Sequence, residues 1–255
     1  MKAKSTAMRI HTLFAIGLGA GYLLSAADEP EQKVQITKTE HFDFPSGGVL
    51  RFKHSVGVLT VEAWDQPGVE ITTIKTTKAE VDVSRRAKGT QQLERIKVAT
   101  ERHGDELGVT TDFPRNRPFR LPYPLSGNTG FDLEYRIKAP ANTRIVADHS
   151  LGQVNLDGLV GDVQVNLAQG EILVHLPEDQ KYNINAKSSF GSVNSDFSEP
   201  EKRNLWPLGH RSIDDNSAAA HKLNLKVGFG DIVILKSRVP KFPGPMTPAP
   251  KAEGL

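Results

Sequence analysis

Asp148-His149-Ser150 is the first stretch whose residue types could do chemistry. The same types form the triad of serine hydrolases, in which a nucleophile, a base and an orienting acid converge in space. Neighbouring residues of a strand point to opposite faces, so three consecutive positions do not converge. The chain also lacks the Gly-x-Ser-x-Gly turn that presents a nucleophilic serine in many hydrolases. We therefore predict a polar strand end here and no catalytic triad.

Metal-binding residue types are present but lack the spacing of known sites. Beyond residues 1–27 the histidines occur singly, without a His-Glu-x-x-His motif or another close pair at helical spacing. Several aspartates near glycines or turns match neither the EF-hand loop nor the Gly-Gly-x-Gly-x-Asp repeat of calcium-binding β-rolls. These aspartates are Asp157, Asp162, Asp214 and Asp215. We predict no metal site, no cofactor and no catalytic residue.

Paired carboxylates are a third possibility, because glycan hydrolases use two acids at a defined separation. Asp162 and Glu171 are isolated acids at outward positions that are mostly asparagine and glutamine. The alternative function is therefore an envelope glycan-active enzyme, a hydrolase or lyase on a β-helix scaffold. Asp162, Glu171 and His175 would be its candidate residues. Because protein surfaces are mostly polar, we favour a solvated, non-enzymatic face.

A stretch rich in arginine, proline and aromatic residues is the best candidate for a recognition surface. Arginine and aromatic side chains are enriched at interaction hot spots. Prolines remove donors that a central strand needs, so residues 112–130 are predicted to form a long loop. The alternative is a loop that only packs on the edge of the domain. The predicted recognition residues are Arg115, Arg117, Phe119, Arg120 and Tyr123 in this loop and Trp206 further along.

A short repeat must position all of these groups. Between Gly152 and Val174 the chain repeats a glycine, a polar residue and then apolar residues two apart, which is the period of a strand with one buried face. Further copies begin at Gly191 and Gly230. The expected inward residues are Val154, Leu156, Val163, Val165, Ile172, Val174, Val193, Leu223, Leu225, Val227, Ile232 and Ile234, and the expected outward residues are Gln153, Asn155, Asp162, Gln164, Asn166, Glu171 and His175.

The constant position of the glycine decides between architectures. Turns of an up-and-down meander lie at opposite ends of a sheet and need not share chemistry. Identical corners at a fixed offset are typical of a solenoid whose turns stack in register. The predicted fold class is therefore all-β, a single-domain β-solenoid, with a β-sandwich as the alternative. Residues 84–95 are the only expected helix, of one or two turns, and residues 96–111 are expected to form a hairpin.

The ends of the chain have different compositions from the repeat. Residues 1–27 combine Lys2, Lys4 and Arg9 with an apolar stretch and small residues before Asp28, which is typical of a cleaved secretory signal. The apolar stretch is shorter than the roughly 20 residues that span a bilayer, so no membrane span is expected after cleavage. The β-solenoid domain is predicted at 33–238, with an insertion at 196–221 that includes Trp206. Residues 239–255 are predicted to be a proline-rich disordered tail.

Charge and cysteine content exclude some functions. The whole chain has a formal charge of +2, but removal of residues 1–27 leaves 29 basic and 30 acidic residues. No basic field remains to bind phosphates, so nucleic acid is not an expected partner. The chain contains no cysteine, which excludes disulfides and thiolate metal sites. An exported protein of this kind must be stabilised by the burial of a core.

Several short elements together resemble a known family. They are Gly47–Leu50, Gly57–Asp65, Ala139-Pro140 and the Gly-x-Val-x-Leu/Val repeats, in an order that covers the chain from about Phe42 to Leu235. In this combination the chain resembles the bacterial putative-adhesin family, a group of exported repeat-bearing domains of unknown function. The resemblance implies a β-solenoid and an envelope or surface location. It carries over no catalytic residues.

The predicted function follows from these observations. We expect a non-enzymatic, exported, adhesin-like binding or scaffolding module at the bacterial cell envelope, in the periplasm or at the cell surface. Its ligand would be an envelope or surface protein or glycan, bound by the flat polar faces and the loops at 112–130 and 196–221. Exposed strands at the two ends of a stack can also pair with another copy, so self-association is possible.

Overall fold

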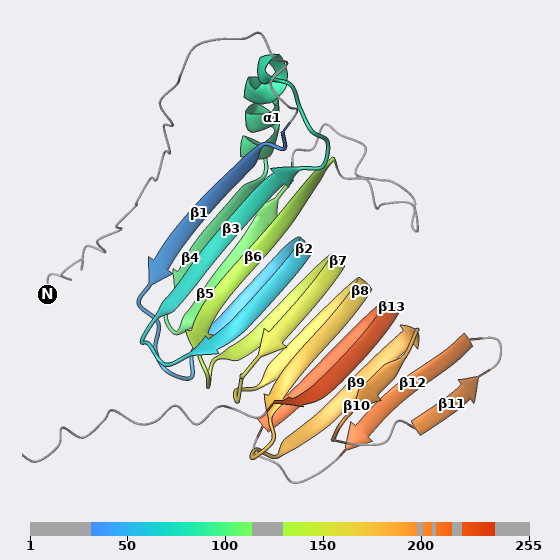
Figure 1. The fold of residues 1–255 in the computed structure, drawn as a ribbon. Coiled ribbons are helices and arrows are strands. Elements are labelled where there is room, and N and C mark those ends of the chain that lie inside the picture. Colours follow the sequence, from blue (N-terminus) through green and yellow to red (C-terminus); the bar gives the residue numbers. More distant parts are fainter. Residues whose placement is uncertain (1–31, 114–129, 198–200, 206–207, 216–220, 238–255) are drawn as a thin grey trace, which may run out of the picture.

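The fold is known from a computed structural model that describes residues 32–113, 130–197, 201–205, 208–215 and 221–237. The expected signal at 1–27 and the expected tail at 239–255 lie outside the described residues. The described part of the chain consists almost entirely of strands. One 13-stranded sheet runs through the molecule. Figure 1 shows its strands stacked side by side from β1 at one end to β11 at the other.

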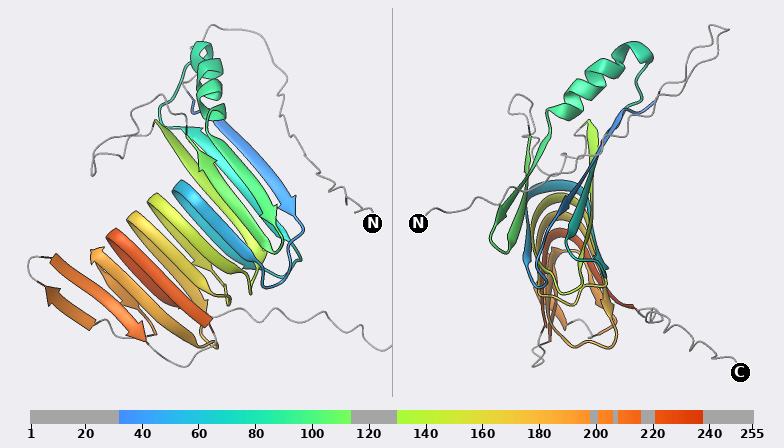
Figure 2. Two further views of the ribbon diagram at one scale, coloured as in Figure 1. Left: turned by 180° about the vertical axis from the view of Figure 1, so that it is seen from behind. Right: turned by 90° about the vertical axis from the view of Figure 1, so that its left-hand side faces the viewer.

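Four long, bent strands form the centre of the stack. They are β2 (Val49–Trp64), β7 (Arg144–Asp157), β8 (Val163–Pro177) and β13 (His221–Ser237). Neighbouring strands are parallel, with Gly57 opposite Gly152, Gly152 opposite Gly170, and Gly170 opposite Gly230. Viewed along the stack, each strand bends so that its two halves face each other (Figure 2). The predicted solenoid of glycine-cornered turns is confirmed.

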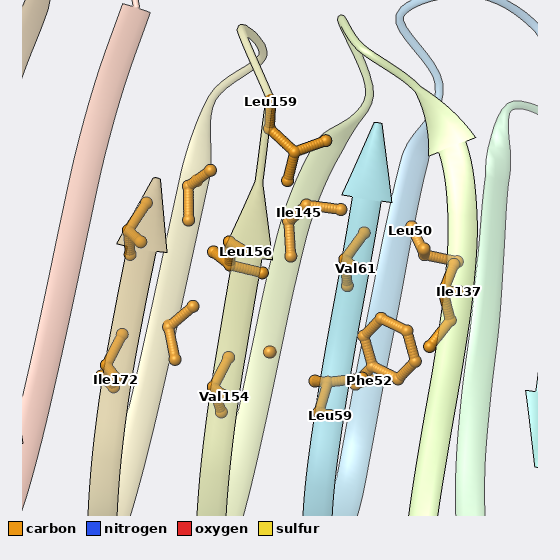
Figure 3. Packing of buried hydrophobic residues seen from close by; sticks show 14 of the residues in the cluster. Leu50, Phe52, Leu59, Val61, Ile137, Ile145, Val154, Leu156, Leu159 and Ile172 are labelled. Atoms are coloured by element: carbon orange, nitrogen blue, oxygen red, sulfur yellow. The ribbon is translucent and has the colours of Figure 1, made fainter. Parts of the chain in front are cut away.

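The core lies between the two halves of the bent strands. All twelve residues of the expected inward set are buried, whereas none of the expected outward residues is. Figure 3 shows side chains from successive strands, including Val154, Leu156 and Ile172, pointing into this shared interior. Because side chains alternate with a period of two, a slip of one residue would expose this whole set. Burial of the repeat therefore specifies the register.

At one end of the stack, the two halves of β2 are covered by different strands. The first half pairs with β5 (Glu106–Asp112), and β5 pairs with β4 (Lys97–His103). The second half pairs with β6 (Phe131–Pro140), followed outward by β3 (Val69–Thr77) and β1 (Gln35–Phe42). The predicted hairpin at 96–111 is confirmed as β4 and β5.

A single described helix, α1 (Val83–Glu94), joins β3 to β4. Asp82 caps its first turn by accepting a hydrogen bond from the Arg85 amide at 3.0 Å. The helix has 12 residues and therefore about three turns, so the expectation of one or two turns was wrong. The carboxylate cap and the burial of Leu93 and Ile96 against the core offset the cost of Gly89.

At the other end, the order in space departs from the order in the chain. The chain runs from β8 to β9 (Tyr182–Phe190) and β10 (Val193–Ser195), yet β13 lies between β8 and β9. The segment predicted as an insertion at 196–221 contains β11 (Glu201–Leu205) and β12 (Leu208–Asp215). These two strands form a hairpin whose β12 pairs antiparallel with β9 and extends the sheet.

Candidate recognition surface

The residues predicted to form a recognition surface lie outside the described residues. They are Arg115, Arg117, Phe119, Arg120 and Tyr123 in the proline-rich loop, and Trp206. Their positions relative to one another are therefore not described. The candidate surface described below therefore consists of other residues.

The three residues of the alternative enzyme do not converge. Asp162 lies just before the start of β8, Glu171 follows the glycine corner, and His175 is near the end of the strand. Glu171 and His175 are four residues apart on an extended strand, which separates them by roughly 13 Å. The Asp162 carboxylate instead accepts a hydrogen bond from the Lys222 amide at 2.9 Å and ties the start of β13 to β8. These positions have structural partners or face solvent.

The glycine corner brings backbone atoms of successive turns unusually close together. Gly152, Gly170 and Gly230 all have positive φ, at +128°, +137° and +132°. A Cβ on any one of them would overlap the carbonyl oxygen of the corner glycine in the preceding strand. Only glycine allows this approach, because it has no Cβ and adopts positive φ without strain. The corner therefore fixes the alignment of the side-chain columns on either side of it.

An open hollow of about 310 Å³ lies on the outer face just before this corner. Its polar lining consists of His54, Asp148, Ser150, Asn166 and Lys226, and the rest of the lining consists of buried His149 and Leu167 and exposed Ala168. Asp148, Asn166 and Lys226 occupy matching positions on β7, β8 and β13. The hollow thus crosses three turns of the solenoid and presents one polar side chain from each.

Two irregularities of the ladder form the hollow. Between β2 and β7 the register shifts on both sides of Ser55, so that each strand carries extra residues at this point. His54, in the bulged segment of β2, has φ +57° and is the one described non-glycine residue with positive φ. β-Bulges bend a strand and redirect side chains, and they are over-represented next to functional sites. Here they place His54 and Ser150 beside the polar column.

The polar groups of the hollow are only partly paired with each other. The Asn166 side-chain amide donates to an Asp148 carboxylate oxygen at 2.9 Å. Arg51 adds a favourable electrostatic interaction with Asp148, although its guanidinium is bonded to Glu106 at 2.7 and 3.0 Å. Among the described residues, no side-chain hydrogen bond or ion pair is made by Lys226. The hollow therefore offers a ligand the Lys226 ammonium group, the Asn166 amide and the Asp148 carboxylate, one oxygen of which already accepts a hydrogen bond from Asn166.

Beneath the hollow, a buried serine and histidine connect β2 to β7. The Ser55 hydroxyl lies 2.7 Å from His149 Nδ1, and His149 Nε2 lies 3.0 Å from the Gly57 carbonyl oxygen. Because a carbonyl only accepts, Nε2 carries the proton and Nδ1 accepts from the serine. Burial lowers the pKa of His149, and the bond to Gly57 opposes that effect. Ser55 is only 1% exposed, so substrate cannot reach it and the pair is structural.

An exposed pair of aromatic rings lies at the same corner, on β9 and β13. Phe190 and Phe229 directly precede the corner glycines Gly191 and Gly230 and are 37% and 39% exposed. Their rings are stacked, with centroids 4.2 Å apart and an angle of 5° between the planes. Gln169 occupies the matching position on β8. Among the residues whose side-chain burial the structure describes, these two phenylalanines are the only exposed large apolar side chains.

Sequence reasoning missed both the hollow and the aromatic pair. The hollow depends on bulges between Phe52 and Val56, which leave no signal in hydrophobic periodicity. The aromatic pair does have a signal, because Phe190-Gly191 and Phe229-Gly230 are the same dipeptide at the same point of the repeat. Their contact, however, requires β13 to lie beside β9, which is known only from the fold.

Neither a metal-binding cluster nor a membrane-spanning helix occurs in the part of the chain that the structure describes. No group of three or more histidine or acidic residues there has an arrangement that could hold a metal ion. The helix in that part is too short and too polar to cross a membrane.

A family model matches the part of the chain that forms most of this sheet. The family model Toastrack DUF4097 matches residues 69–235, and the chain belongs to that family. The match covers the second half of the stack and most of the first, including the corner glycines of β7, β8, β10 and β13. It confirms the family resemblance drawn from the sequence. None of the curated proteins compared matches the chain.

Solved structures from several bacteria align with most of the chain at low sequence identity and low TM-score. A putative cell adhesion protein from Clostridium sporogenes is 15% identical, with a TM-score of 0.47, over 81% of this chain and 100% of its own. A putative adhesin from Bacteroides fragilis is 10% identical, with a TM-score of 0.30, over 79% and 97%. A putative lipid binding protein from Parabacteroides distasonis is 9% identical, with a TM-score of 0.24, over 80% and 97%.

Proposed function

We propose that this protein is an exported, non-enzymatic binding module of the bacterial cell envelope. The observation that supports the proposal is the outer face beside the glycine corner. There, the polar side chains of Asp148, Asn166 and Lys226 and the stacked rings of Phe190 and Phe229 are repeated across adjacent turns. Aromatic and polar groups at fixed spacing are suited to holding a ligand by several simultaneous contacts.

A scaffold of this kind suits binding better than catalysis. Ser55 and His149 are buried against each other, and His149 is also hydrogen-bonded to the Gly57 carbonyl. Glu171 and His175 of the alternative enzyme are separated along β8. The rigidity of the parallel ladder keeps exposed side chains at constant intervals of about 4.8 Å between turns. A repeated surface of this type binds an extended ligand with little loss of conformational freedom on the protein side.

Export is part of the proposal and is supported by residues 1–27. We expect cleavage before Asp28, which would release a chain that starts with Asp28-Glu29-Pro30. Amino-terminal sequencing of the protein recovered from a bacterial host tests this directly. Recovery of the uncleaved chain from the cytoplasm would contradict it.

A binding screen tests the function itself. Residues 28–255 would be incubated with fractionated cell envelopes and with a panel of envelope glycans, beside a variant that lacks residues 113–123. Saturable binding of any component supports a binding module, and its loss in the deletion variant would place the site in the proline-rich loop. Binding that persists without the loop places it on the solenoid face. Absence of any binding, together with turnover of a glycan, would overturn the proposal in favour of an enzyme.

A further inference from the structure

We propose that the hollow at Asp148, Asn166 and Lys226, together with the Phe190–Phe229 pair, binds a glycan chain. This inference rests on the proposed binding function and assigns it a site and a class of ligand. The two features are the hollow before the glycine corner and the exposed aromatic pair at the corner itself.

The charges in the hollow favour a neutral, hydroxyl-rich ligand. Asp148 and Lys226 have opposite charges and line the same 310 Å³ space. For a ligand with a single charge, attraction to one of these two groups is offset by repulsion from the other. Sugar hydroxyls both donate and accept hydrogen bonds, so they can pair with the carboxylate, the ammonium group and the Asn166 amide at once. Hydrogen bonds to charged groups are the stronger ones.

The aromatic pair provides the second kind of contact that a sugar ring needs. The flat face of a phenylalanine ring carries partial negative charge, and the C–H groups on one face of a pyranose carry partial positive charge. The rings of Phe190 and Phe229 are nearly parallel and stacked, and more than a third of each side chain is exposed. An exposed apolar pair at one defined place on an otherwise polar surface marks an interaction site.

The distance between the two features sets the size of the ligand. Lys226 and Phe229 are three residues apart on β13, which corresponds to roughly 10 Å along an extended strand. An oligosaccharide of a few units can contact both groups more fully than a monosaccharide can. The turns also repeat at about 4.8 Å, which is comparable to the length of one hexose unit. We therefore expect affinity to increase with chain length.

Titration with defined sugars tests the proposal. The probes are chitotetraose, cellotetraose and the monomer of each, added to residues 28–255 in a calorimeter. We expect a tetramer to bind at least tenfold more tightly than its monomer. Lys226→Ala and Phe229→Ala should each weaken tetramer binding by about tenfold, the effect of one charge-assisted hydrogen bond or one aromatic contact. The Lys226 side chain is exposed, so Lys226→Ala should unfold at the wild-type temperature. Phe229→Ala also loses the stacking on Phe190, so it should unfold at a slightly lower temperature while remaining folded in the calorimeter.

Asn194→Ala is the matched control, because Asn194 is an exposed polar residue of β10 beyond the corner. It should leave tetramer binding unchanged. Tetramer binding that Lys226→Ala and Phe229→Ala do not weaken would overturn this site while leaving the binding function intact. Binding of an envelope protein but of neither tetramer would overturn the glycan inference alone. Failure of every envelope component to bind would overturn the proposed function and this inference together.

Discussion

The corner glycines act at the level of single atoms. In each of β7, β8 and β13, the missing Cβ leaves room for a carbonyl oxygen of the neighbouring turn. The positive φ at these positions is a second reason why other residues are excluded. Both effects act at Gly170, which lies between two other corner glycines in the centre of the stack.

Gly170→Ala should therefore destabilise the protein strongly. The new methyl group would collide with the Gly152 carbonyl, and alanine would be held at φ +137°. Strain and overpacking each cost about 1–3 kcal/mol, so we expect a loss of about 3 kcal/mol or more in urea denaturation. Gly104→Ala is the control, because Gly104 has φ +60° but nothing near its Cβ position. A loss of only about 1 kcal/mol is expected there, and equal losses for the two variants would contradict the proposed role of close packing.

His149 should make stability depend on pH. Burial lowers the pKa of His149 in the folded protein, so the unfolded chain binds more protons below the ordinary histidine pKa of about 6.5. The stability contributed by neutral His149 is therefore complete above that pH. It is lost as pH falls toward the folded pKa, by up to about 1.4 kcal/mol per pH unit. Protonation would also remove the acceptor that Nδ1 offers to the Ser55 hydroxyl.

Urea midpoints measured between pH 7.5 and pH 5 check this contribution. His149→Gln should flatten the decline in stability toward low pH, even if it lowers stability at neutral pH. His103→Gln is the matched control, since His103 is exposed at the β4–β5 turn, where its ring lies 3.6 Å from the Glu101 carboxylate. A decline that is as steep in His149→Gln as in the wild type would show that other groups cause it.

At the scale of the elements, hydrophobic periodicity was sufficient for each strand but not for their order. The alternation around Val154, Ile172 and Ile232 identified which face of each strand is buried, because a period of two admits only one inward set. Hydrophobic periodicity does not specify that β8 pairs with β13 and not with β9. That choice depends on how the hairpin β11–β12 leads the chain back to the stack. Helix α1 is longer than its sequence predicts because Asp82 caps its first turn, and this contact leaves no trace in hydrophobic periodicity.

Engineered disulfides can test the order of the strands, since the native chain has no cysteine. Gln164 on β8 and Asn224 on β13 are exposed, in-register neighbours. Replacement of both by cysteine should give an intramolecular disulfide, because neighbouring strands lie within the Cα separation that a disulfide allows. By closing a long loop it should stabilise the fold by at most about 4 kcal/mol. Non-reducing electrophoresis and urea denaturation measure the two effects.

The control pair is Gln164→Cys with Asn185→Cys. Asn185 on β9 is in register with Asn224, so β13 separates it from Gln164. Two strand spacings amount to roughly 9.6 Å, which exceeds the reach of a disulfide. The control should remain reduced. If the control pair crosslinks and the first pair does not, the strands stack in chain order and β13 is not between β8 and β9.

At the scale of the whole molecule, the candidate site is an outcome of assembly. Asp148, Asn166 and Lys226 are on three strands, and Lys226 comes from the strand that returns last. Each residue is ordinary in its local sequence, where a lone polar side chain on an outward position carries no functional signal. Only the stacking of turns makes a column of them. The same reasoning explains why Asp148-His149-Ser150 attracted attention as a triad, although His149 is buried and Asp148 and Ser150 are exposed.

The stack has a protected centre and open ends. Strands β7, β8 and β13 each have a paired strand on both sides, whereas β1 and β4 have one neighbour each. Stability in a quasi-one-dimensional array is a sum of nearest-neighbour terms. The end strands therefore open more easily than the centre, and their free backbone groups are where another copy or a partner strand could add.

Hydrogen exchange should reveal this gradient along the stack. Amides of β7, β8 and β13 are expected to exchange only through global unfolding, because they are held in ladders on both sides and lie around the buried core. Amides of β1 and β4 should exchange by local opening and be protected at least tenfold less, as edge strands with mostly exposed side chains. Mass spectrometry of peptic fragments resolves these segments. If β1 were as strongly protected as β8 and lost that protection on dilution, a second copy of the chain would cover the edge. Equal protection at every concentration would instead show that the fold opens as one unit, and the additive description of its turns would be wrong.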